Sequence, residues 1–126
     1  MAKTEKTCIR GCANVDMINR SIELLKELNQ DLISTCHLLN LTGNETRFKI
    51  LFLIKNNERI CVCDMSDILG ISISAVSQQL SKLKNGGLLI SSKEGQTIYY
   101  SISTNYKDKL DQLFIIISSK IVTEAA

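Results

Sequence analysis

Residues Ile60 to Lys84, ICVCDMSDILGISISAVSQQLSKLK, contain the features on which the fold prediction rests. Two thiols, Cys61 and Cys63, stand before a short apolar segment that ends at Gly70, a residue able to adopt the left-handed conformation that closes a helix. Asp64 is predicted to cap this helix. After a tight turn, apolar residues recur at helical spacing. They are Ile73, Val76, Leu80 and Leu83.

The second predicted helix has a small, polar face opposite its apolar stripe. Small residues allow close approach, Ser and Gln hydrogen-bond base edges and phosphates, and Lys neutralises phosphate. This face therefore suits the major groove of DNA, although a solvated helix face has a similar composition. The face comprises Ser74, Ala75, Gln78, Ser81 and Lys82.

The segment after Lys84 predicts a β-hairpin. Asn85-Gly86-Gly87 ends the helix, and two strand-like segments, 88–93 and 97–102, flank a turn at Glu94-Gly95-Gln96. Helix, turn, helix and hairpin, in this order, form a winged helix. The predicted fold class is mainly α with a β-hairpin wing.

Three segments, ICVCDMSDILGIS, SQQLSKLKNGGLL and KEGQTIYYSI, resemble the ArsR/SmtB family of metal-responsive winged helix-turn-helix repressors. The resemblance covers residues 44–102 by motif and the flanking helices by position. It implies that residues 72–84 form the recognition helix, with Ser77, Gln78 and Gln79 near DNA. Many members carry His in place of Gln79, so the resemblance does not define the operator sequence. The full set of expected DNA contacts is Ser74, Ser77, Gln78, Gln79, Lys82 and Lys93.

Within the family, the chain resembles the cadmium- and lead-responsive branch, whose members pair a Cys-x-Cys motif with cysteines of an N-terminal arm. The matching residues are Cys61 and Cys63 together with Cys8 and Cys12. The resemblance implies a homodimer that binds an inverted repeat of operator DNA and releases it when metal binds. The alternative interpretation of Cys61 and Cys63 is a pair of buried structural cysteines.

The number of sulfur ligands narrows the choice of metal ion. Thiolates select thiophilic ions, and two sulfurs are too few for a tight mononuclear site, so the arm cysteines are needed. Cd²⁺ would use four thiolates and Pb²⁺ commonly three, while Zn²⁺, Hg²⁺ and As(III) remain competent alternatives. Because Asp64 is the predicted cap, residues 60–63 are expected to be extended or irregular, and an extended segment would point both thiols to one side.

The composition is typical of a folded, soluble protein. Its 126 residues, 44% hydrophobic and 22% charged, suit one domain, and the net charge of +2 does not decide between partners. No apolar run of about 18 residues and no signal sequence is found, so we expect a cytoplasmic protein without a membrane span. Its five cysteines are then expected to be reduced thiols.

The N-terminal third is predicted to contain an arm and one long helix. Residues 1–14 are polar and lack periodicity, which predicts a flexible arm, and residues 15–126 are expected to form the DNA-binding and dimerisation domain. A helix over 16–40 would pack across a dimer, with Cys36 as a small core residue and His37 solvated. Its predicted stripe is Ile18, Ile22, Leu25, Leu28, Leu32 and Leu39.

Two further helices are predicted, one over 45–56 capped by Asn44 and one after residues 103–105. Arg47 in the first could form a salt bridge or contact phosphate, and both roles are left open. The last helix has a broad apolar face that predicts a second dimer contact. It contains no histidine, so we expect the zinc site that some family members carry there to be absent or impaired.

Three other functions make different predictions. A thiol-redox-sensing repressor would use the same cysteines and respond to peroxide instead of metal. An enzyme with a nucleophilic cysteine would need a base, but His37 is the only histidine and no Cys-x-x-Cys or phosphate loop is present. A winged helix that serves only protein contacts would show no salt-dependent DNA binding.

Overall fold

The structure is a computed structural model that describes residues 11–125, with side-chain surroundings given up to residue 117. The chain divides into two units, one ending at Ile33 and the other beginning at Ser34, and each is described by itself. Cys8 and most of the predicted arm lie outside the described residues. No helix of the described part is long and apolar enough to cross a lipid bilayer.

The first unit contains α1 (Val15–Glu27) and the start of α2 (Asn29–Thr42). The Asn14 side chain caps α1 by accepting the Met17 N–H at 2.9 Å. The single helix predicted over 16–40 is wrong, because α1 ends at Glu27 and α2 begins at Asn29. Asn favours a helix start over a helix interior, since its side chain competes for backbone hydrogen bonds.

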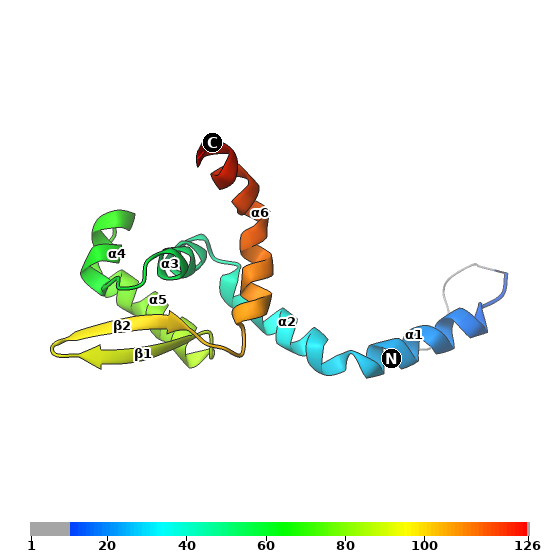
Figure 1. Ribbon diagram of the computed structural model, residues 1–126. Coiled ribbons are helices and arrows are strands. Elements are labelled where there is room, and N and C mark those ends of the chain that lie inside the picture. The colour runs from blue at the N-terminus through cyan, green and yellow to red at the C-terminus, as the bar shows by residue number, and fades with distance from the viewer. Residues whose placement is uncertain (1–10, 126) are drawn as a thin grey trace. The chain divides into compact units, whose positions relative to one another are not determined.

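The second unit is the winged helix-turn-helix that the sequence predicts. It contains α3 (Glu45–Asn56), α4 (Val62–Leu69), α5 (Ile73–Asn85) and α6 (Lys107–Ala125). Strands β1 (Leu89–Glu94) and β2 (Thr97–Ile102) pair antiparallel across a two-residue turn whose Gly95 has a φ of 64°. Figure 1 shows this hairpin projecting beside α4 and α5 as a wing.

The apolar stripes of α3, α4 and α5 converge on one core. Met65 of α4 and Val76 of α5 are fully buried, as is Leu51 of α3, and burial of each such side chain contributes about 1.5–3 kcal/mol. Ile60, directly before the thiols, is also buried and so anchors the start of α4 in the core. The remaining core residues are Leu38, Ile50, Ile54, Leu80, Leu83, Leu88, Leu89, Leu110 and Phe114.

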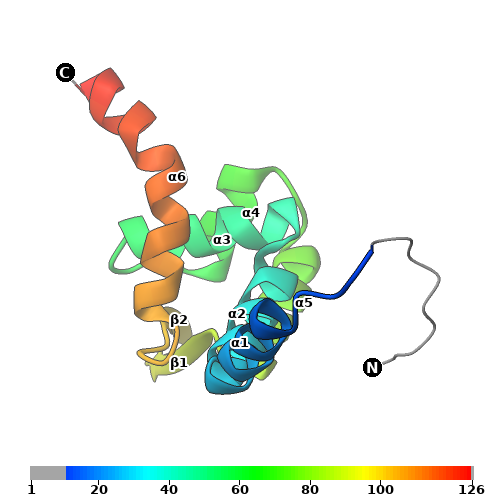
Figure 2. The ribbon, with the colours of Figure 1, turned by 90° about the vertical axis from the view of Figure 1, so that its right-hand side faces the viewer.

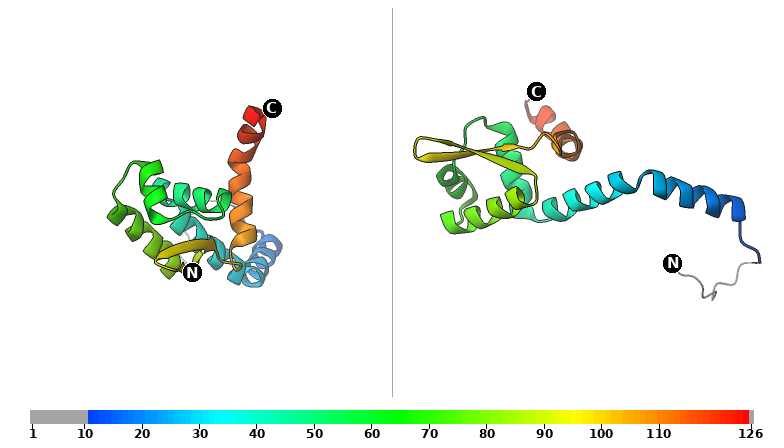
Figure 3. Two further views of the ribbon diagram at one scale, coloured as in Figure 1. Left: turned by 60° about the vertical axis from the view of Figure 1, so that its left-hand side comes forward. Right: turned by 90° about the horizontal axis from the view of Figure 1, so that it is seen from below.

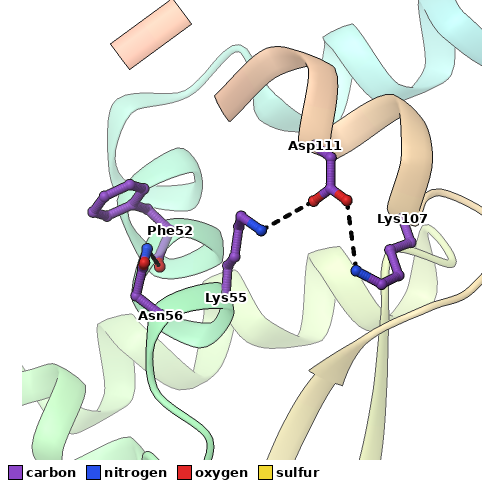
Figure 4. Close-up of polar contacts among 5 residues, drawn as sticks. All are labelled: Phe52, Lys55, Asn56, Lys107 and Asp111. Carbon is purple, nitrogen blue, oxygen red and sulfur yellow. Dashed lines mark hydrogen bonds and ion pairs between the residues drawn. The ribbon is translucent and has the colours of Figure 1, made fainter. Parts of the chain in front are cut away.

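Helix α6 crosses α3 (Figures 1 and 2). Phe114 of α6 packs against Phe48 and Phe52 of α3, with ring centroids 5.4 and 5.8 Å apart. Asp111 Oδ1 lies 3.2 Å from Lys55 Nζ of α3, and its other carboxylate oxygen lies 3.5 Å from Lys107 Nζ (Figure 4). The C-terminal half of α6 projects beyond the other helices of this unit (Figure 3, left).

The prediction that Cys36 is a core residue is wrong. Its side chain is exposed, and α2 instead buries Leu38 and Thr42, which lie on a different face. Leu39, part of the predicted stripe, is 49% exposed. The chain's own core covers the Leu38 face, and the apolar stripe through Cys36 and Leu39 is exposed.

Candidate nucleic-acid interface and thiol pocket

The turn between α4 and α5 is fixed by short local hydrogen bonds. Gly70 ends α4 with a φ of 69°, a conformation that other residues rarely adopt. The Ser66 hydroxyl donates to the Ile71 carbonyl at 2.6 Å, and the Ser72 hydroxyl accepts the Ala75 N–H at 3.0 Å. These contacts set the angle between α4 and the predicted recognition helix, α5.

Helix α5 has the two faces that its sequence predicts, but the prediction that Ile73 belongs to the buried stripe is wrong, because Ile73 is 52% exposed. Its buried stripe joins the core, and Ser72 and Gly86 bound the helix at its two ends. On the opposite side, small and polar side chains are exposed in a row with helical spacing. The exposed row is Ser74, Ser77, Gln78, Ser81 and Lys82.

Gln79 differs from the other expected DNA contacts. It is partly buried, and its Oε1 accepts a hydrogen bond from Arg47 Nη1 at 3.1 Å. Arg47 also donates from Nε to the Leu41 carbonyl at 2.6 Å and from Nη2 to the Asn40 carbonyl at 3.5 Å. Instead of the salt bridge considered from the sequence, Arg47 thus connects the end of α2 to α5. No sequence signal indicates this contact.

The wing carries Lys93, the last of the expected DNA contacts, and its side chain is exposed. Next to it, Glu94 Oε1 lies 2.6 Å from Arg59 Nη2, and the Arg59 guanidinium stacks 4.3 Å from the centre of the Tyr99 ring. The hydrogen bond from Arg59 lowers the pKa of Glu94. Arg59 thereby links the wing to the loop that precedes Cys61 and Cys63. The sequence did not predict this contact.

Cys61 and Cys63 open α4. Cys61 is the N-cap in an extended conformation and Cys63 is already helical, so the prediction of an extended segment through Cys63 is wrong. Asp64 is not the cap but the third helical residue, and its carboxylate accepts the Cys61 N–H at 3.1 Å. This backbone hydrogen bond lowers the pKa of Asp64. The reciprocal pairing of Cys61 and Asp64 is a capping box.

Both thiols line one pocket, of about 370 Å³, at the junction of α4, α5 and the wing. The pocket reaches Ser77, an exposed residue of α5, and the turn of the hairpin. A group bound at the thiols would therefore lie against both predicted DNA-binding elements. The lining residues are Cys61, Val62, Cys63, Ile73, Ser77, Gln96, Thr97 and Ile98.

The thiol pair does not form a complete metal site by itself. In the part of the chain that the structure describes, no three histidine, cysteine, aspartate or glutamate side chains gather closely enough to hold one ion. Cys12 is exposed in the first unit, and Cys8 lies outside the described residues. Two thiolates in a partly apolar pocket fit a soft ion only if further sulfur ligands join them.

Comparison with known proteins identifies the family. The family model of bacterial regulatory proteins of the arsR family matches residues 44–91. The cadmium resistance transcriptional regulatory protein CadC of Listeria innocua is 32% identical to this chain over 95 residues, which are 75% of this chain and 78% of that protein. The chain belongs to the ArsR family.

Two further proteins are similar to parts of this chain. The arsenical resistance operon repressor of Escherichia coli is 33% identical over 66 residues, 52% of this chain and 56% of that protein. The structure of reduced HlyU from Vibrio cholerae is 33% identical and superposes with a TM-score of 0.64 over 73% of this chain and 97% of that one. As an ArsR-family member with a winged helix-turn-helix, the chain is a DNA-binding transcriptional regulator and not an enzyme.

Proposed function

We propose that the chain is a metal-sensing repressor that binds an inverted repeat of operator DNA as a homodimer in the cytoplasm. A thiophilic ion bound by cysteine thiolates releases the dimer and so derepresses metal-resistance genes. The observation that carries this proposal is the pocket in which Cys61 and Cys63 meet Ser77 of α5 and the turn of the wing. The resemblance to CadC of Listeria innocua, a cadmium resistance regulator by name, supports it.

The proposed ligands are Cys61 and Cys63 with Cys8 and Cys12 of the N-terminal segment. Four thiolates favour Cd²⁺, three favour Pb²⁺, and Zn²⁺, Hg²⁺ and As(III) are chemically competent in sulfur sites. Cys61 and Cys63 occupy the first turn of α4, where backbone N–H groups lack helical partners and favour negative charge.

The proposed release mechanism follows from the position of α4. Its first turn holds Cys61 and Cys63, and its last residue is joined through the Gly70 turn to α5. Thiolates drawn toward further sulfur ligands would shift α4, and α5 would shift with it because Ser66 fixes the turn. By linkage, DNA would weaken metal binding by the same factor, and a useful switch needs a coupling of about 1–3 kcal/mol.

The proposed homodimer rests on exposed apolar side chains. No residue of α1 is buried. Its apolar residues Leu25 and Leu24 are 59% and 53% exposed. On α6, Ile116 is 75% exposed. Apolar surface of this extent on helices marks a protein contact, and a two-fold dimer would present two copies of α5 to successive major grooves.

The test is an anaerobic titration of reduced protein with Cd²⁺, Pb²⁺ and Zn²⁺, followed by sulfur-to-metal charge-transfer absorption. Single Ser variants of Cys8, Cys12, Cys61 and Cys63 should each weaken the band. Cys36→Ser is the matched control, because Cys36 is exposed on α2 and belongs to neither proposed pair. Operator binding measured in parallel should fall as the ion saturates the protein.

Two results would contradict the proposal. If reduced protein shows no charge-transfer band, the thiols do not bind these ions. If a band forms while operator affinity stays constant, the metal site is not regulatory. Loss of DNA binding with peroxide, reversed by a thiol reductant and unaffected by metal, would instead identify the thiol-redox repressor that uses the same cysteines.

A further inference from the structure

Two adjacent glutamines of α5 have different surroundings. Gln78 is exposed, whereas Gln79 is partly buried and accepts a hydrogen bond from Arg47. Successive residues of a helix point about 100° apart, so one glutamine can face outward while its neighbour faces the protein. Gln78 and Gln79 therefore have the same chemistry, but one faces solvent and the other contacts the protein.

Arg47 joins three helices at one side chain. It lies in the first turn of α3, where its backbone N–H is fixed by the Asn44 cap at 3.0 Å. Its guanidinium reaches two carbonyls in the last turn of α2, those of Asn40 and Leu41, and the amide oxygen of Gln79 in α5. Carbonyls in a last helical turn lack helical partners, and the planar guanidinium offers five donors in a fixed fork. The contact therefore restricts rotation of α5 about its axis.

We propose that Arg47 and Gln79 are positioning residues, which hold the recognition helix at one rotation, and that Gln78 is the residue that determines base specificity. Glutamine can pair with both N6 and N7 of adenine in the major groove. Gln78 and its exposed neighbours Ser74 and Ser77 face outward while Gln79 is held inward. The inference rests on the DNA binding of the family and does not depend on the proposed metal response.

The experiment compares the same substitution at the two neighbouring positions in reduced, metal-free protein. Gln78→Glu and Gln79→Glu are each tested by selection from a random duplex library and by affinity for the wild-type consensus. Gln79→Glu should keep the consensus and stay within about threefold of wild-type affinity, because a carboxylate still accepts from Arg47. Gln78→Glu should alter the preferred base at one position per half-site and weaken binding about tenfold or more, because Glu accepts from cytosine instead.

A double-mutant cycle tests the positioning role. Arg47→Gln and Gln79→Leu should each lower affinity for every sequence alike, without changing the consensus. The double variant should bind no more weakly than the weaker single variant, because Arg47→Gln already removes the contact with Gln79 that Gln79→Leu removes. Thermal melting checks that each variant is folded. The comparison of Gln78→Glu with Gln79→Glu tests the inference even if an Arg47 variant does not fold.

The inference is overturned if Gln79→Glu shifts the consensus as Gln78→Glu does, since both side chains would then read bases. It is also overturned if Gln78→Glu leaves the consensus unchanged, or if the double variant loses the sum of the two single effects. These outcomes are independent of metal, so they can be told apart from a failed charge-transfer titration.

Discussion

At the scale of single residues, Gly86 decides how closely α2 approaches the recognition helix. It is the C-cap of α5, and a Cβ there would overlap Leu41 Cδ1 and lie 3.1 Å from Leu41 Cδ2. The Gly86 carbonyl accepts a hydrogen bond from His37 Nε2 at 2.7 Å. His37 is exposed, as predicted, and its hydrogen bond to Gly86 also links α2 to the end of α5.

The corresponding prediction concerns Gly86→Ala. The added methyl overlaps the end of the half-buried Leu41 side chain, which must shift, and we expect a loss of about 1 kcal/mol in the free energy of unfolding. Urea unfolding followed by circular dichroism measures this loss. Leu41→Ala in the same chain removes the overlapping methyls, so the double variant should lose less than the two single losses added together. Additive losses would show that the added methyl does not act through Leu41.

At the scale of elements, α6 is held on α3 by an aromatic contact and by the ion pairs of Asp111. Phe114 supplies the aromatic part, and Asp111 lies between Lys55 and Lys107 (Figure 4). The hydrogen bond from Lys55 lowers the pKa of Asp111. About a third of each charged side chain at the α3 contact is exposed, so solvent screens this ion pair.

The lowered pKa of Asp111 fixes the sign of a pH effect. The carboxylate stabilises the fold above its unfolded pKa, about 3.9, and this stabilisation is lost as pH falls through the lower pKa of the folded state. Thermal midpoints measured from pH 6 to pH 2 should therefore fall less steeply in Asp111→Asn than in wild type below about pH 4. Parallel curves for the two proteins would contradict a lowered pKa of Asp111 in the folded state. Asp67→Asn, on the exposed side of α4, is the control.

At the scale of the whole molecule, the apolar side chains of α1 predict self-association. We expect Leu25→Glu to shift the proposed dimer toward monomer, because it places a carboxylate in the centre of the apolar stripe. Sedimentation velocity should show at least a tenfold rise in the dimer dissociation constant, which corresponds to about 1.4 kcal/mol. Operator affinity should fall with it, since two half-sites must be bound together.

A matched variant distinguishes interface disruption from a charge effect. Arg20→Glu adds a carboxylate about 140° around α1 from Leu25, outside the stripe of Ile18, Ile22 and Leu25, and it should leave the proposed dimer unchanged at moderate salt. Equal weakening by Arg20→Glu and Leu25→Glu would argue that net charge, and not the apolar stripe, controls association. Full dimerisation of Leu25→Glu would place the interface elsewhere.

The sequence by itself determined the elements that depend on near neighbours. Helical spacing of apolar residues placed α3 and α5, Asn44 capped α3 as predicted, and Gly70 and Gly95 closed their turns. The family motif also lies within this continuous stretch. Such signals are readable because cap, turn and periodicity join residues only a few positions apart.

Only the tertiary structure decided which side chains of those elements are available for function. Gln79 is held by Arg47, 32 positions earlier in the chain, and Cys36 is exposed because the core covers another face of α2. The thiols share a pocket with Ser77 because the wing folds back beside α4. Contacts between distant segments depend on the packing of the whole core, and no local pattern in the chain specifies them.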